Sequence, residues 1–151
     1  MTAADLIALL TARGQTLGCA ESLTGGLLTD AFVQVPGASR VLMGGIVAYD
    51  EGCKQSLLGV PAETLARYTA VSEQTACEMA RGARAALKTD YALSTTGYAG
   101  PDGADVGLVY VGFSGPTGTT TREYRFRGNR AEIRRQAVDA AVALLAEHIN
   151  E

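Results

Sequence analysis

The stretch TLGCAESLTGGLLTDAFVQ, residues 16–34, indicates the fold more directly than any other part of the chain. Its first five residues read as a short apolar strand, and residues 21–26 form a turn rich in Ser, Thr and Gly. Residues 27–34 are predicted as a helix that ends before Pro36 and Gly37. A buried strand that turns directly into a helix is typical of an α/β fold, so we expect a sheet with helices packed on it.

The remaining elements continue this alternation over the first hundred residues. Helices are predicted at about 2–12, 50–57, 61–67 and 72–87, and strands at 45–49 and 91–96. After a loop at 97–106, strands at 108–113 and 119–126 form a predicted antiparallel hairpin, and Asn129 with Glu132 opens a last helix to about residue 149. The predicted fold class is α/β: a single-domain three-layer α/β/α sandwich with a mixed sheet, over residues 1–151.

Composition and charge exclude several classes of protein. Of the 151 residues, 47% are hydrophobic, 13 are Lys or Arg and 16 are Asp or Glu. Nucleic-acid binders need clustered Lys and Arg to neutralise phosphates, so the net charge of −3 argues against such a partner. No apolar run approaches the roughly 20 residues that a membrane helix needs, and residues 1–13 do not resemble a signal peptide. We therefore expect a cytoplasmic domain with no nucleic-acid and no membrane partner.

Cysteine and histidine usage narrows the chemistry further. The three cysteines, Cys19, Cys53 and Cys77, show no CxxC or Cys/His spacing, which predicts neither a metal site nor a disulfide scaffold. The single histidine, His148, stands near the end of the last predicted helix, where it is poorly placed for catalysis. A Ser-His-Asp triad is thus disfavoured, and for a serine nucleophile a lysine base is the simplest alternative.

The turn after the first strand is the first candidate site. Ser22, Thr24, Gly25 and Gly26 stand at a predicted helix start, where backbone N–H groups and the helix dipole favour an anion or oxyanion. Ser22 at such a turn can present its hydroxyl outward as a nucleophile. The alternative is structural: the hydroxyls cap the helix and the glycines form the turn. The motif is neither a Walker A nor a GxGxxG sequence, so it carries no nucleotide fingerprint.

Lys54 is the second candidate. It follows the predicted strand at 45–49 by about one helical turn, and ligand sites in open α/β sheets form beyond the carboxyl ends of strands. A lysine in a partly closed apolar pocket loses hydration, which lowers its pKa and lets it act as a base. The alternative is a solvated surface lysine, which is the commoner situation.

Two further segments are candidates for ligand binding. Residues 95–103 contain three glycines and a proline after a predicted buried strand, which lets the backbone approach a ligand closely. An ordinary long turn is the alternative. A basic cluster follows near the last helix, and its members are Arg125, Arg127, Arg130, Arg134 and Arg135. Arg130 and Arg134 lie one helical turn apart and can meet a phosphate together, although a solvated face or an oligomer contact is also compatible.

Several blocks of the sequence, taken in order, resemble the CinA C-terminal domain family. Residues 20–26, AESLTGG, are close to its AESCTGG signature, and residues 44–60 resemble its next block, an apolar strand ending in Tyr, then a Lys, then Leu-Gly-Val. Residues 70–73, AVSE, match its helix start, residues 96–103, TGYAGPDG, are near its TGIAGPDG loop, and residues 126–134 resemble its F-x-G-x-R-x-x-x-R close. The likeness covers about residues 5–147.

This resemblance implies a function. Characterised members of the family are nicotinamide-nucleotide amidohydrolases, which convert nicotinamide mononucleotide and water to nicotinate mononucleotide and ammonia with a Ser/Lys dyad. The matching positions here are Ser22 and Lys54, which we expect to be catalytic without a metal or cofactor. The oxyanion is expected to lie against N–H groups of the Gly25-Gly26 turn or the Gly97 loop.

The resemblance also implies a binding site and an assembly. A small-molecule nucleotide is the expected partner, with Thr96 and Tyr49 near its pyridine amide or base and Arg130 or Arg134 on its 5′-phosphate. The full expected set of substrate-binding residues is Thr24, Gly25, Gly26, Tyr49, Thr96, Gly97, Gly100, Arg130 and Arg134. By the same resemblance, a homo-oligomer is expected.

Three departures from the family pattern bear on the substrate. Leu23 stands where cysteine is usual, and Tyr98 stands where isoleucine is usual. The chain passes directly from Gly103 through residues 104–106 to Gly107, where many relatives have a longer insert. The N-terminal molybdopterin-binding-like domain of longer members is absent, so the chain is expected to be the stand-alone form. Two alternatives stay open: a regulatory module that binds a nucleotide or phosphate ligand without turnover, and an amidase of another small amide.

Overall fold

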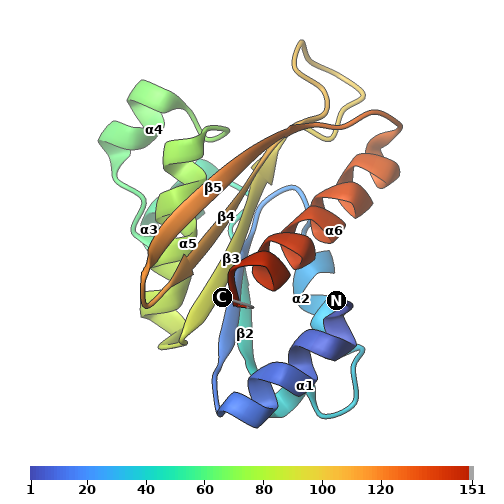
Figure 1. Ribbon diagram of the computed structural model, residues 1–151. Helices are drawn as coiled ribbons and strands as arrows, with labels where there is room; N and C mark the ends of the chain where they lie inside the picture. The colour runs from blue at the N-terminus through green and yellow to red at the C-terminus, as the bar shows by residue number, and fades with distance from the viewer. Residues whose placement is uncertain (150–151) are drawn as a thin grey trace.

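A five-stranded mixed sheet forms the middle layer of the computed structural model, which describes residues 1–149 (Figure 1). Its strands are β1 (Leu17–Glu21), β2 (Leu42–Val47), β3 (Tyr91–Gly97), β4 (Leu108–Gly115) and β5 (Gly118–Arg125). Their spatial order is β2-β1-β3-β4-β5. β1 runs parallel to β2 and β3, whereas β4 is antiparallel to both β3 and β5. The predicted mixed sheet and its closing hairpin are confirmed.

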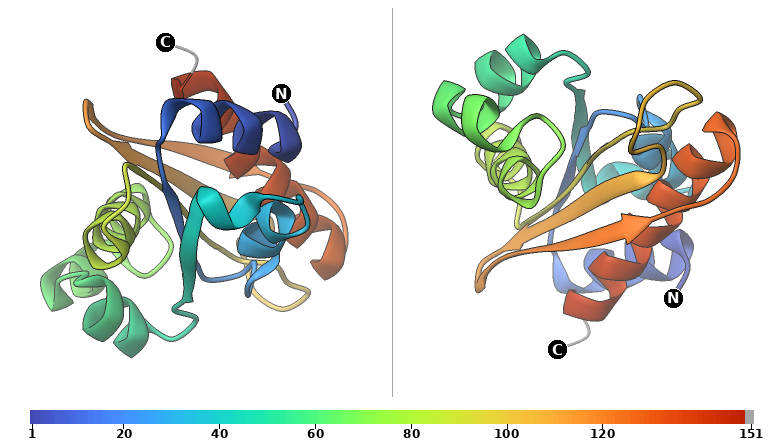
Figure 2. Two further views of the ribbon diagram at one scale, coloured as in Figure 1. Left: turned by 90° about the horizontal axis from the view of Figure 1, so that it is seen from below. Right: turned by 90° about the horizontal axis from the view of Figure 1, so that it is seen from above.

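Helices cover both faces of this sheet, as the α/β/α prediction requires (Figure 2). One face carries α1 (Ala3–Arg13), α2 (Leu27–Val33) and α6 (Arg130–Ile149), and the other carries α3 (Glu51–Leu58), α4 (Ala62–Tyr68) and α5 (Glu73–Leu87). A short 3-10 helix, η1 (Ala38–Arg40), was not predicted. Leu10, Phe32 and Leu144 belong to the buried core on the first face, whereas Leu58 and Met79 belong to the core on the second. The burial of these side chains is the main force that holds the layers together.

Capping residues set the helix boundaries near the predicted positions. Thr2 and Asp5 form a reciprocal capping box at the start of α1, and Gly14 ends that helix in the left-handed conformation. At the start of α6, the N–H of Asn129 donates to Glu132 Oε1 at 2.9 Å, and the N–H of Glu132 donates to Asn129 Oδ1 at 2.9 Å. The predicted capping box is thus present with Asn in the Ser/Thr position.

β2 differs from its prediction, because it spans Leu42–Val47 instead of 45–49. It begins earlier because Leu42 already pairs with Leu17 of β1. Gly44 and Gly45 interrupt the apolar pattern of the strand, so the sequence does not indicate this early start. It ends earlier because the carbonyl oxygens of Ala48 and Tyr49 accept hydrogen bonds from the Lys54 side chain. The last residues of the predicted strand therefore belong to the candidate site.

The two ends of the sheet are formed by different parts of the strands. At one end, Glu21 of β1 pairs with Val47 of β2 and Thr95 of β3, so the carboxyl ends of three parallel strands meet there. At the other end, Ser114 of β4 pairs with Ala92, near the start of β3, and the turn between β4 and β5 follows. We call these the carboxyl end and the hairpin end of the sheet.

Candidate active site

Ser22 is the first residue after β1, at the carboxyl end of the sheet. Its backbone N–H donates to the carbonyl oxygen of Thr95 at 3.1 Å, which ties the turn to β3. Its Oγ lies 3.0 Å from the Nζ of Lys54, and the residue is 7% exposed. The structure therefore brings together the two residues that the sequence predicted as a dyad, although 31 residues lie between them in the chain.

Lys54 is buried at the start of α3, with only 2% of its surface exposed. Its Nζ makes three contacts at 3.0 Å: the carbonyl oxygens of Ala48 and Tyr49, and Ser22 Oγ. Burial lowers the pKa of Lys54, and the negative charges of Glu51 and Asp50 oppose part of that shift. A neutral amine that donates two N–H groups to the carbonyls directs its lone pair at Ser22 Oγ. This geometry suits a base that removes the serine proton.

Glu21 is a buried residue beside the site that the sequence did not single out as a candidate. Its carboxylate is fully buried and accepts from the N–H groups of Gly26 at 3.1 Å and Leu28 at 2.8 Å. It also accepts from the N–H and the hydroxyl of Thr29, at 2.9 and 2.6 Å. It thus anchors the start of α2 next to the turn at residues 22–26, which we call the nucleophile turn because Ser22 is the predicted nucleophile. The available signal was an acidic residue between an apolar strand and a helix start, where the helix dipole favours a negative charge.

The turn glycines have their N–H groups engaged within the chain. Gly25 N–H donates to the Ser22 carbonyl at 3.1 Å, and Gly26 N–H donates to Glu21. Gly26 has a φ of 107°, a backbone conformation that requires glycine. The Thr24 hydroxyl lies 2.8 Å from the Thr95 hydroxyl and is fully buried. Between the serine and the glycines, the N–H groups of Leu23 and Thr24 donate to no other group within residues 1–149.

The two arginines of α6 make different contacts. Arg134 donates from Nε to the Leu23 carbonyl at 2.8 Å and from Nη2 to the Thr24 carbonyl at 3.1 Å, so its guanidinium holds the nucleophile turn. Arg130 is exposed and donates to the Gly100 carbonyl at 2.6 Å and to the Tyr49 hydroxyl at 3.4 Å. Arg130 therefore links the loop after β3 to the loop after β2, at the rim of the site.

The remaining predicted binding residues lie in or beside β3. Thr96 is fully buried and its hydroxyl donates to the Ala70 carbonyl at 2.6 Å. Gly97 ends β3 opposite Val109, and Gly100 presents its carbonyl to Arg130. Tyr49 is 64% exposed at the rim. The part that each of these residues plays in substrate binding stays a prediction.

Other groups considered from the sequence lie apart from the dyad. The ring of His148 stacks on Phe113 with a centroid distance of 4.8 Å, on the strand that ends at the hairpin end. Cys19 is fully buried, and burial raises the pKa of its thiol, which leaves it unreactive. Over residues 1–149, no three His, Cys, Asp or Glu side chains gather as metal ligands would.

Comparison with known proteins places this arrangement in a family. Residues 1–149 match the model of the CinA C-terminal domain. The chain belongs to the CinA C-terminal domain family. A Desulforamulus reducens protein that carries a competence-damage inducible name is 51% identical over 138 residues, which cover 89% of this chain and 33% of that protein. A CinA-like protein of Anaeromyxobacter is 46% identical over 144 residues, 93% of this chain and 35% of the relative. The chain thus spans about a third of the length of these curated relatives.

Solved structures of CinA family members share the whole fold. A competence/damage inducible protein from Agrobacterium tumefaciens superimposes with a TM-score of 0.95 at 37% identity, covering 99% of this chain and 93% of that one. A CinA superfamily protein from Escherichia coli gives a TM-score of 0.93 at 32% identity, covering 96% and 87%. As for membranes, the helices within residues 1–149 are too short or too polar for any of them to span a bilayer.

Proposed function

We propose that this CinA-family chain is a serine amidohydrolase in which Ser22 is the nucleophile and Lys54 is the general base. The reaction that we assign is hydrolysis of the carboxamide of nicotinamide mononucleotide to nicotinate mononucleotide and ammonia. One observation carries the proposal: Ser22 Oγ lies 3.0 Å from a buried amine whose other two contacts are carbonyl oxygens. The resemblance to characterised members of the family supplies the substrate.

The proposed reaction has two halves. Neutral Lys54 takes the proton of Ser22 as Oγ attacks the carboxamide carbon, and a tetrahedral intermediate forms. The intermediate collapses with cleavage of the C–N bond, and Lys54 returns its proton to the departing nitrogen, which leaves as ammonia. Water then attacks the acyl-serine with Lys54 again as base, and the protonated lysine returns a proton to Ser22 Oγ as the carboxylic acid leaves.

We assign stabilisation of the oxyanion to the N–H groups of Leu23 and Thr24. The sequence favoured the Gly25-Gly26 turn or the Gly97 loop, but both turn glycines donate within the chain. Leu23 is the residue after the nucleophile, the position that supplies an oxyanion donor in other serine hydrolases. Arg134 binds the carbonyl of Leu23, which belongs to the same peptide group as the Thr24 N–H. This contact holds that N–H in a fixed direction, which is the condition for electrostatic stabilisation.

The contacts of the two arginines favour different roles toward the substrate. Both guanidinium groups donate from two nitrogens, but Arg134 is half-buried against the nucleophile turn, whereas Arg130 is exposed at the rim and makes only a long 3.4 Å contact to the Tyr49 hydroxyl besides its bond to Gly100. We therefore assign the 5′-phosphate to Arg130 and the positioning of the turn to Arg134. The binding roles of Thr96, Gly97 and Gly100, and assembly as a homo-oligomer, remain parts of the proposal that the family resemblance supports.

The test is ammonia release from nicotinamide mononucleotide by the purified protein. The wild type should release ammonia, Ser22→Ala should not, and Ser56→Ala, an exposed serine on α3, should behave as the wild type. Nicotinamide riboside and nicotinamide, run in parallel, separate a nucleotide amidohydrolase from an amidase of simpler amides. Binding of the nucleotide without release of ammonia by any variant would overturn the proposal in favour of a non-catalytic binding module.

A further inference from the structure

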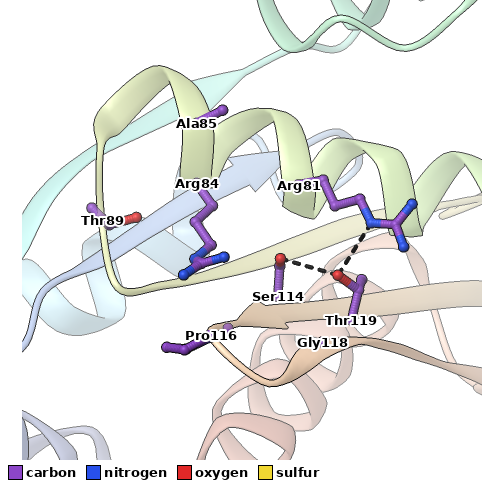
Figure 3. A pocket seen from close by; sticks show the side chains of 9 residues that line it. Arg81, Arg84, Ala85, Thr89, Ser114, Pro116, Gly118 and Thr119 are labelled. Atoms are coloured by element: carbon purple, nitrogen blue, oxygen red, sulfur yellow. Dashed lines mark hydrogen bonds between the residues drawn. The ribbon is translucent and has the colours of Figure 1, made fainter.

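A polar cavity lies at the hairpin end of the sheet, and neither Ser22 nor Lys54 lines it (Figure 3). It has a volume of about 520 Å³ and is lined by the C-terminal half of α5 and by the turn between β4 and β5. This size lies within the range of small-molecule sites in proteins, roughly 300–1,000 Å³. Because β3 extends between this cavity and the Ser22 turn, the two sites are separate, and the cavity has no part in the reaction proposed above.

Two arginines give the cavity its charge. Arg81 and Arg84 lie three residues apart on α5, so both project on the same side of the helix, over the hairpin (Figure 3). Arg81 Nε donates to the Thr119 hydroxyl at 3.3 Å, and Arg84 Nε donates to the Asp90 carbonyl at 2.9 Å. These contacts orient both guanidinium groups. Neither group forms an ion pair within residues 1–149, and no carboxylate lines the cavity.

Hydroxyl groups complete the lining. Thr119 Oγ1 accepts from Arg81 and lies 3.1 Å from Ser114 Oγ (Figure 3). If Thr119 donates to Ser114, the Ser114 proton is free for another acceptor. Thr89 is also a lining residue, and its buried Oγ1 has no hydrogen-bond partner among the described residues. The lining thus combines unpaired positive charge with hydroxyl donors and offers a ligand no competing negative charge.

We propose that this cavity is a binding site for a phosphate group, either free or on a small phosphate ester. Each guanidinium keeps both of its Nη atoms for a ligand, and these planar donors match the oxygens of a phosphate. A carboxylate has only two acceptor oxygens, and one guanidinium can bind both of them. Two arginines together with lining hydroxyl groups therefore suit a phosphate better than a carboxylate.

The experiment is a ¹H–¹⁵N NMR titration of the purified chain with inorganic phosphate at constant ionic strength. Saturable shifts are expected at the amides of Gly115, Gly118 and Thr119, and potassium chloride should not reproduce them. Arg81→Gln with Arg84→Gln should weaken binding about tenfold or more, since both substitutions remove charge-assisted hydrogen bonds to the phosphate. Arg84→Lys keeps the positive charge but loses the planar guanidinium group. Its affinity for phosphate should lie between those of the wild type and the double variant.

The controls distinguish phosphate binding in this cavity from non-specific attraction of phosphate to surface arginines. Arg40→Gln with Arg67→Gln removes two exposed arginines elsewhere and should bind phosphate as the wild type does. Parallel titrations with glycerol 3-phosphate and adenosine monophosphate distinguish free phosphate from a phosphate ester as the natural ligand. The proposal is overturned if the wild type shows no saturable shift at the hairpin, or if the Arg81/Arg84 variant, with a spectrum that shows it is folded, binds as tightly as the wild type.

Discussion

The carboxyl end and the hairpin end of the sheet both hold basic side chains, but the two environments of these side chains are opposite. At the carboxyl end, the Lys54 amine is 2% exposed and all three of its hydrogen-bonding directions have partners within the chain. The buried carboxylate of Glu21 is likewise surrounded by four donors. At the hairpin end, Arg81 and Arg84 are oriented through Nε alone and face an open cavity.

The buried amine of Lys54 and the guanidinium groups of Arg81 and Arg84 are therefore suited to different tasks. Burial of an amine costs hydration energy, which lowers the pKa of Lys54 and, under the proposed function, lets the amine act as a base before any ligand binds. At the hairpin end, the Nη atoms of Arg81 and Arg84 form no hydrogen bond within residues 1–149 and are available to an anion. The contrast predicts that substitutions at the carboxyl end change reaction rate and stability, whereas those at the hairpin end change only binding of an anion.

The largest effect is expected when the two lysines of the chain are compared. Lys54→Met should lower turnover of nicotinamide mononucleotide by about 10³-fold or more, because the serine loses its base. Lys88→Met makes the same change at an exposed position near the hairpin end and should leave turnover unchanged. Steady-state kinetics of both variants measure this. Equal activity of Lys54→Met and the wild type would contradict the assignment of the base.

The pH dependence tests the lowered pKa of Lys54. The neutral amine is the reactive form, so kcat/KM should rise with pH by about tenfold per unit and level off below about pH 10.4, the ordinary lysine value. The folded pKa lies below the unfolded one, so the unfolded chain binds more protons between them and stability rises with pH in that window. Urea unfolding should show this gain in the wild type and in Lys88→Met but not in Lys54→Met. A rate that is flat with pH would refute the lysine base.

An intermediate effect is expected from the two arginines of α6. Arg134→Gln should lower kcat about 10–100-fold with both nicotinamide mononucleotide and nicotinamide riboside, because a displaced nucleophile turn slows every substrate alike. Arg130→Gln should raise KM about tenfold for the mononucleotide alone, since the riboside has no phosphate. If Arg134→Gln impairs only the phosphorylated substrate, the two roles are reversed.

A smaller effect, on stability, is expected at Glu21. Glu21→Gln places an amide NH₂ group among N–H donors and leaves at least one of them without an acceptor, which should cost about 1–3 kcal/mol of unfolding free energy. Glu51→Gln, an exposed carboxylate at the start of α3, serves as the control and should change stability by less. Urea denaturation at neutral pH compares them. Equal stability of Glu21→Gln and the wild type would mean that the carboxylate does not anchor α2.

Much of the fold follows from local sequence. Alternating apolar segments, capping residues such as Asn129 and stop signals such as Gly14 act within a few residues, so they are legible without a structure. The motif around Ser22 and the position of Lys54 are equally local, and the family pattern connects them. The boundaries of β2 were not predictable, because they depend on which partner the backbone meets: Leu17 at the start and the Lys54 amine at the end.

What the sequence by itself determined is therefore the order of the elements, the α/β class and the identity of the two candidate catalytic side chains. Only the tertiary structure decided which polar groups are occupied. Gly26 N–H donates to Glu21 and Arg134 binds the nucleophile turn, so neither is free as the sequence suggested, while Arg81 and Arg84 hydrogen-bond through Nε and form no ion pair within residues 1–149. The physical reason is that a hydrogen bond is formed between groups that folding brings within about 3 Å, and these groups lie far apart along the chain.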